Sequence, residues 1–177
     1  MRAEAVDRIR LVFTLFDADG NGVLEDADFE LMANRVLEAA TGSDDADKAA
    51  MLAAFRGYWA VLSDNLDADH DRRITFEEYQ ACVLSPELFD EAIGEFADAL
   101  AKLGNPRGDG LVARSVFMPL MTAIGFEPAN SDALFDAFGP DASDQIEAET
   151  WVTGIKDFYH PDKAGIPGDH LVGRPAA

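Results

Sequence analysis

The sequence has little positive charge and a single cysteine. Its 177 residues carry 14 Lys and Arg against 34 Asp and Glu, which gives a formal net charge of -20 at pH 7. A nucleic-acid binder needs a basic surface to displace counterions from phosphate, and the same negative charge disfavours anionic membranes. One cysteine cannot form an intramolecular disulfide, as is typical of proteins from reducing compartments. We therefore expect neither nucleic acid nor a membrane as a partner.

Long hydrophobic runs are also missing. No stretch approaches the ~18 apolar residues that a membrane-spanning helix requires, and the acidic Glu4 and Asp7 stand where a signal peptide would have its apolar region. These absences predict a cytoplasmic protein. The chain is nevertheless 48% apolar and contains 12 Phe. It can therefore build a hydrophobic core, unlike a disordered acidic tail.

A pattern of apolar helix faces around polar loops recurs along the chain. Ile9, Val12, Phe13 and Phe16 are spaced 3, 1 and 3 residues apart, as on one face of a helix, and a polar loop follows them. Loops in comparable surroundings start at residues 17, 67, 105 and 139. The repeat predicts an all-α protein of four helix–loop–helix units.

The four units are expected to pair two by two, because a single unit would leave its apolar stripe exposed. An aliphatic residue at the eighth position of each loop can join partner loops in a short two-stranded contact; these residues are Leu24, Ile74, Val112 and Ile146. We predict an N-terminal pair over residues 1–90, a C-terminal pair over 91–160 and a tail over 161–177.

Residues 17–28 match the EF-hand calcium-binding loop at positions 1, 3, 5, 6 and 8. Ca²⁺ takes six to eight oxygen ligands at roughly 2.3–2.6 Å, and alternate residues of a curled loop point inward. The predicted ligands are the side chains of Asp17, Asp19, Asn21, Glu25 and Asp28 and the backbone carbonyl of Val23. Asp28 is one methylene shorter than the usual Glu, so either the loop tightens or it offers fewer oxygens, which would favour Mg²⁺ as a competitor.

Residues 67–78 form a second predicted loop with a different defect. Its ligands would be Asp67, Asp69, Asp71, the carbonyl of Arg73, Thr75 directly or through water, and Glu78. Arg72 occupies the sixth position, where the loop normally has Gly. Holding a non-glycine residue at positive φ costs on the order of 1–2 kcal/mol, but we still expect this loop to bind metal.

The other two loops have lost ligands. Residues 105–116 place Arg107 at position 3, where its charge would repel a cation, and Val116 at position 12, where no oxygen is offered. Residues 139–150 begin with Gly139, have Asp144 in place of Gly and end at Thr150. We expect two Ca²⁺ sites, with the second pair of units serving as packing partners.

With its four repeats, wide first spacing, Asp28 closing the first loop and the ending at residues 155–160, the chain resembles the sarcoplasmic calcium-binding proteins. It is most similar to their actinobacterial relatives of the calerythrin type. The resemblance implies a compact, two-lobed protein that buffers or transports Ca²⁺ in the cytoplasm, with the C-terminal tail packed between the lobes. Loops 105–116 and 139–150 depart from the family pattern, in which the fourth loop often binds metal.

Two functions remain open at this level. The first is a monomeric Ca²⁺ buffer, because the sequence has only five Met and calcium sensors usually present Met-rich grooves. The second is a Ca²⁺ sensor whose metal-free C-terminal lobe docks a partner protein. An enzyme is not expected, since the three His and the single Cys form no recognisable nucleophile–base pattern.

Overall fold

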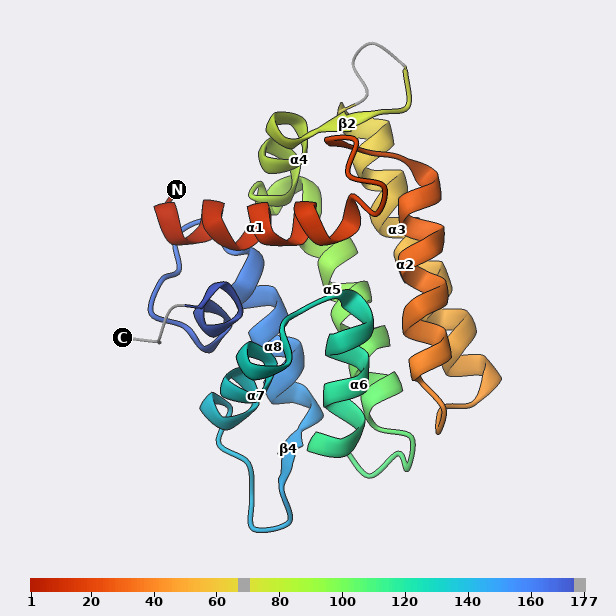
Figure 1. Cartoon of the computed structure of the whole chain (residues 1–177), viewed down its shortest axis with the longest axis vertical. Coiled ribbons are helices and arrows are strands. Elements are labelled where there is room, and N and C mark those ends of the chain that lie inside the picture. The colour runs from red at the N-terminus through yellow and green to blue at the C-terminus, as the bar shows by residue number, and fades with distance from the viewer. Residues whose placement is uncertain (67–70, 174–177) are drawn as a thin grey trace.

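In the computed structural model, residues 1–66 and 71–173 are described, and they form helices joined by short strand-forming loops (Figure 1). The helices are α1 (Ala3–Phe16), α2 (Asp26–Ala39), α3 (Asp45–Leu66), α4 (Phe76–Val83), α5 (Pro86–Gly104), α6 (Arg114–Ile124), α7 (Pro128–Ala137) and α8 (Ala148–Tyr159), followed by the 3₁₀ helix η1 (Pro167–Val172). The strands are β1 (Val23–Leu24), β2 (Ile74–Thr75), β3 (Leu111–Ala113) and β4 (Gln145–Glu147). The predicted all-α class with four helix–loop–helix units is confirmed.

The loops of each pair are joined by a short antiparallel contact. Leu24 pairs with Ile74 between β1 and β2, and Val112 pairs with Ile146 between β3 and β4. All four side chains are buried, because each lies on the inner face of its strand. The predicted two-stranded contacts, with these residues paired across them, are therefore confirmed.

The core consists of helix faces lined by aromatic residues. On α1, the predicted face of Ile9, Val12, Phe13 and Phe16 is buried. Phe16 stacks on Phe29 of α2, with ring centroids 4.5 Å apart. The helical spacing read from the sequence therefore identified the surface that joins α1 to α2.

The two lobes share this core. Helix α5 runs without interruption across the predicted boundary at residues 90 and 91, and it packs against α3 of the first pair and α8 of the second. Tyr58 of α3 lies 2.6 Å from the hydroxyl of Tyr79 and donates to the hydroxyl of Tyr159 at 3.3 Å. Because Tyr159 belongs to α8, this buried contact connects the lobes.

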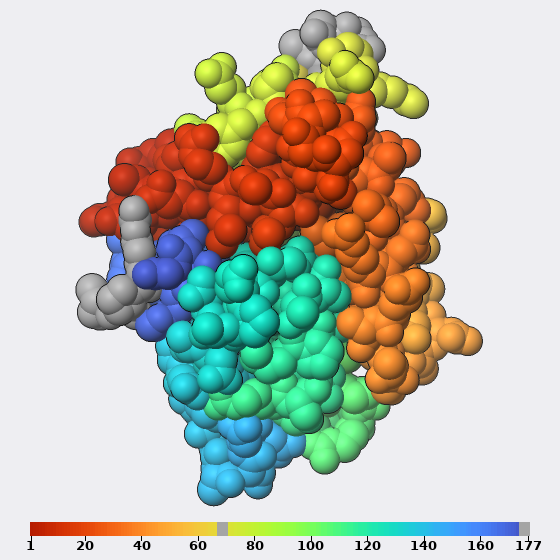
Figure 2. All heavy atoms as spheres, in the orientation of Figure 1, coloured from red at the N-terminus to blue at the C-terminus, as the bar shows by residue number. Residues whose placement is uncertain are grey.

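The segment after α8 folds back over the body of the protein. Its 3₁₀ helix, η1, packs against α1, α7 and α8, and Figure 2 shows this blue segment between the red N-terminal and the teal C-terminal helices. Leu171 of η1 is buried. In the described part of the chain, no helix combines the length and apolar character needed to cross a membrane.

Candidate metal centre

Three carboxylates of the first loop converge on one point. Asp17 follows the last residue of α1, Asp19 lies in the loop, and Asp28 is the third residue of α2. Each offers one carboxylate oxygen, and these oxygens all lie within 4.8 Å of one another. The apolar contact between α1 and α2 therefore holds like charges together, and such an arrangement attracts a hard cation.

Backbone N–H groups hold the first loop in its curled form. Asn21 N donates to Asp17 Oδ1 at 3.0 Å and to Asp19 Oδ1 at 3.1 Å, while Gly22 N donates to Asp17 Oδ2 at 2.9 Å. Val23 N donates to Asn21 Oδ1 at 3.0 Å. Gly22 has a φ of 86°, as expected where a side chain would resist the turn. The loop thus brings the side-chain oxygens of positions 1, 3 and 5 toward its interior.

Asp28 is the most buried of these acids, at 5% exposure. Its Oδ2 accepts from Glu25 N at 2.9 Å and its Oδ1 accepts from Ala18 N at 3.2 Å. Burial raises the pKa of Asp28, the charges of Asp19 and Asp17 raise it further, and the two N–H donors oppose the shift. A bound cation would offset the repulsion that these three carboxylates exert on one another.

The ninth-position acid of the first loop faces the second loop. Glu25 Oε1 accepts from Arg73 Nε at 2.9 Å, and both side chains are partly exposed. The sequence predicted Glu25 as a ligand and Arg73 only through its carbonyl, so this ion pair was missed. To bind metal directly, Glu25 would have to exchange its contact with Arg73 for the cation.

The second loop is described only from Asp71 onward. Asp67 and Asp69, predicted as its first two ligands, lie outside the described residues. Asp71 Oδ1 accepts from Arg73 N at 2.8 Å, the same turn that Asn21 makes in the first loop. Arg72 has a φ of 60°, so the positive φ expected from its sixth position is present.

The end of the second loop is closed by a capping box. Glu78 Oε2 accepts from Thr75 N at 2.8 Å and from Thr75 Oγ1 at 2.9 Å, and Glu78 N donates back to Thr75 Oγ1 at 3.3 Å. This reciprocal arrangement stabilises the start of α4. It also fixes the twelfth-position carboxylate against the loop, in the way that the Glu25 N–H fixes Asp28.

Two guanidinium groups of residues 105–116 pair with acids of the other two loops. In residues 105–116, Arg107 Nε lies 3.1 Å from Asp109 Oδ2. The cation predicted to repel a metal at position 3 therefore pairs with the carboxylate at position 5. Asp109, the acid that remains in this loop, is therefore already paired with the positive charge of Arg107.

Arg114 joins the acids of the C-terminal pair. Its Nε donates to Asp144 Oδ1 and Oδ2 at 3.0 and 2.9 Å, its Nη2 to Asp136 at 2.6 Å and its Nη1 to Asp132 at 2.5 Å. The guanidinium also lies over the ring of Phe135, 4.4 Å from its centroid. These contacts, with Asp144 first, raise the pKa of Arg114. Sequence reasoning missed this residue, because its partners on α7 and in the fourth loop are 18 to 30 residues away.

Comparisons with known proteins agree with this geometry. No protein-family model matches the chain. Calerythrin of Saccharopolyspora erythraea is 26% identical over 166 residues, covering 89% of this chain and 93% of the relative. A Streptomyces coelicolor calcium-binding protein superimposes with a TM-score of 0.71 at 25% identity, covering 90% of this chain and 99% of that one. A sarcoplasmic calcium-binding protein from amphioxus gives 0.70 at 22% identity, with 98% of each chain covered.

The paired loops, their two-stranded contacts and the converging acids are those of the EF-hand fold. Within that class the chain is a homologue of calerythrin. The resemblance to sarcoplasmic calcium-binding proteins of the calerythrin type, predicted from the repeats and the first loop, is confirmed.

Proposed function

We propose that this protein binds two Ca²⁺ ions, in loops 17–28 and 67–78, and acts as a cytoplasmic Ca²⁺ buffer or transporter. The convergence of Asp17, Asp19 and Asp28 within 4.8 Å carries the proposal. All the groups offered are oxygens, as a hard cation prefers. Calerythrin and the Streptomyces protein, which is described as calcium-binding, support the assignment of Ca²⁺.

The ligand set follows the loop positions. In the first loop, the side chains of Asp17, Asp19, Asn21 and Asp28 and the carbonyl of Val23 would hold the ion, with Glu25 at position 9. In the second loop, Asp67, Asp69, Asp71, the Arg73 carbonyl, Thr75 and Glu78 would do so. The short Asp28 makes the first loop the better site for Mg²⁺, which demands tighter octahedral geometry with shorter metal–oxygen distances.

Burial of the methionines favours a buffer over a sensor. Sensor EF-hands open a Met-rich groove when Ca²⁺ binds. Here Met32, Met51 and Met121 are at most 3% exposed. Among the described residues, the exposed large apolar side chains are Met1, Leu31 and Leu88. Met1 precedes α1, Leu31 belongs to α2 and Leu88 belongs to α5. These three side chains offer no Met-rich surface. A monomeric buffer, which binds ions without docking a target protein, is therefore favoured over a sensor.

Calorimetric titration of the metal-free protein with Ca²⁺, with and without millimolar Mg²⁺, tests the two sites. We expect a stoichiometry of two, with Asp17→Ala removing one site and Asp67→Ala the other. Asp141→Ala, which removes a fourth-loop acid, is the matched control and should leave both. A wild-type stoichiometry of three or four would show that the C-terminal loops bind metal after all.

Dye binding to apolar surface distinguishes a buffer from a sensor. A buffer should bind a fluorescent hydrophobic dye almost equally in the metal-free and Ca²⁺-loaded forms. A large Ca²⁺-dependent increase would overturn the buffer proposal and support a sensor that docks a partner protein. The Asp17→Ala, Asp67→Ala double variant provides the control, because any increase caused by Ca²⁺ must disappear with the sites.

A further inference from the structure

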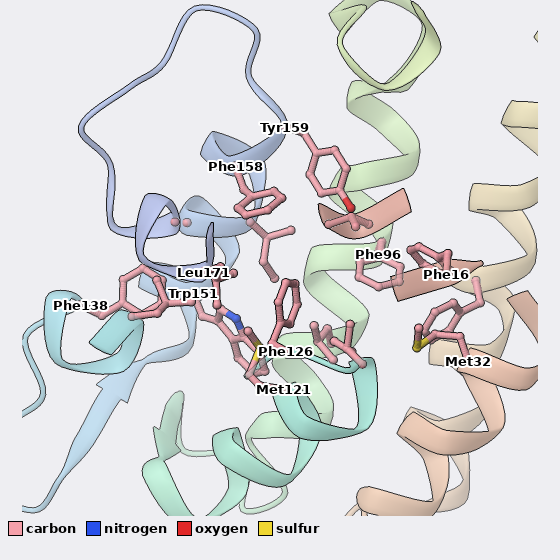
Figure 3. A pocket seen from close by; sticks show the side chains of 18 residues that line it. Phe16, Met32, Phe96, Met121, Phe126, Phe138, Trp151, Phe158, Tyr159 and Leu171 are labelled. Atoms are coloured by element: carbon pink, nitrogen blue, oxygen red, sulfur yellow. The ribbon is translucent and has the colours of Figure 1, made fainter. Parts of the chain in front are cut away.

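An apolar cavity of about 60 Å³ lies between the lobes (Figure 3). Side chains from both pairs of units and from η1 line it, including Val12 of α1, Phe96 of α5, Trp151 of α8 and Leu171 of η1. None of its lining residues is charged. The cavity is separate from both metal loops, so it requires its own explanation.

One hydrogen-bond donor in the cavity wall has no partner. Trp151 is 1% exposed, and the benzo edge of its indole packs on Gly104, where an added Cβ would lie 2.6 Å from Cζ3. The pyrrole edge, which carries Nε1, therefore points away from Gly104, and Figure 3 draws this nitrogen among the lining side chains. No described residue accepts a hydrogen bond from Nε1. Buried indole N–H groups usually have an acceptor. Among the described residues, the fully buried polar side-chain atom without a partner is Ser131 Oγ, so Nε1 is not sealed by protein atoms and borders the accessible space of the cavity.

Water is a poor match for this cavity. A buried water needs two to four polar partners, and the wall offers chiefly the Trp151 N–H. The other polar side chain in the wall, Tyr159, is already bonded through its hydroxyl to Tyr58 at 3.3 Å. Cavities lined by apolar side chains stay dry and accept apolar molecules. The complementary ligand is therefore apolar except for one acceptor.

We propose that the cavity binds a small uncharged molecule with an alkyl body and one carbonyl oxygen, which accepts a hydrogen bond from Trp151 Nε1. The volume limits the ligand to a few heavy atoms, because sites for larger ligands measure roughly 300–1,000 Å³. Short ketones, aldehydes and esters share this chemistry. The inference does not depend on metal binding.

Titration of the ¹⁵N-labelled full-length chain with 2-butanone, followed by NMR, tests the proposal. The indole N–H signal of Trp151 should shift and saturate, while that of Trp59, which lies outside the cavity wall, should not move. Trp59→Phe assigns the two signals. 2-Methyl-1-butene, which has a similar shape but no carbonyl, should bind at least several-fold more weakly. An unmoved Trp151 signal, or equal linear shifts of both tryptophans, would overturn the proposal.

Filling the cavity provides the second test. Val12→Leu adds volume to the wall, and we expect it to weaken 2-butanone binding at least tenfold. Val6→Leu makes the same change on α1 at a partly buried position outside the wall and should leave binding unchanged. If Val12→Leu does not fold, Leu171→Phe fills the cavity from η1 instead. Undiminished binding in a folded, filled variant would contradict the site. Ca²⁺ stoichiometry, measured on the same samples, reports separately on the metal loops.

Discussion

Arg8 of α1 and Asp169 of η1 form a buried ion pair, with Nη1 donating to Oδ1 at 2.7 Å. Arg8 Nε donates to the carbonyl of Phe158, and Nη2 donates to the carbonyls of His160 and Lys163. Asp169 Oδ2 accepts from the N–H groups of Gly165 and Ile166. Each charge thus makes several hydrogen bonds, and the pair attaches the C-terminal segment to the helix that leads into loop 17–28.

Removing one partner of this pair should strongly destabilise the protein. Asp169→Ala leaves the Arg8 charge buried without its counter-charge, so we expect the free energy of unfolding to fall by about 3–5 kcal/mol. Urea denaturation measures the change. Glu30→Ala breaks the exposed Arg56–Glu30 pair, whose attraction is screened by solvent, and should cost far less than Asp169→Ala. Equal losses in the two variants would contradict the role assigned to the buried pair.

Arg72→Gly should strengthen the second metal loop. The substitution removes a side chain from a residue with φ of 60°, which should relieve about 1 kcal/mol of backbone strain. If only the metal-bound form must hold this φ, the strain opposes binding, and removing it should raise the Ca²⁺ affinity of this loop by up to about tenfold. Calorimetry on a background carrying Asp17→Ala isolates the second loop. Gly22→Ala, which introduces a Cβ at the equivalent position of the first loop, should act in the opposite direction there.

Asp28→Glu should shift the first loop toward Ca²⁺. The longer carboxylate can coordinate the larger ion through both oxygens, as position 12 normally does. We expect the ratio of Ca²⁺ to Mg²⁺ affinity to rise several-fold, measured by competition titration on a background carrying Asp67→Ala. Asp26→Glu, a change of the same size on the exposed side of α2, is the control. An unchanged ratio would mean that the length of residue 28 does not set selectivity.

Arg114→Met should make the C-terminal lobe sensitive to added cations. The variant leaves Asp132, Asp136 and Asp144 without the guanidinium that now joins them. Because these acids are more than half exposed, solvent screening limits the loss to about 1–2 kcal/mol. Thermal unfolding should show that salt stabilises the variant more than the wild type. Identical salt dependence in the two proteins would contradict the proposed charge matching.

Alkaline pH should destabilise the native state through Cys82. Burial raises the pKa of this thiol from 9.0 to about 11, so the folded state keeps a proton that the unfolded state releases. Its contribution to stability is present below pH 9.0 and is lost as pH rises through about 11. The difference in unfolding free energy between wild type and Cys82→Ala should shrink over this range by at most about 3 kcal/mol. A pH-independent difference would show that the thiol does not titrate as proposed.

Local patterns account for the parts of the structure that the sequence could predict. The 3-1-3 spacing places Phe16 on the buried face of α1, and the eighth loop position pairs Leu24 with Ile74, because both features depend on residues within one repeat. Contacts between repeats were missed. Arg8 meets Asp169 across 161 residues, and Glu25 meets Arg73 across 48. No spacing rule links such residues, since tertiary packing alone brings them together.

Because α5 packs without interruption against helices of both lobes, the fold would not depend on metal ligands in the C-terminal loops. Either half, once detached, would expose aromatic surface that the other half now covers, so we expect the lobes to melt together in one cooperative transition. With metal assigned to the N-terminal loops as proposed, mutational drift in the C-terminal loops would be constrained by the packing of their helices and not by coordination chemistry. The C-terminal half can persist as an obligatory folding partner of the half that is proposed to bind Ca²⁺.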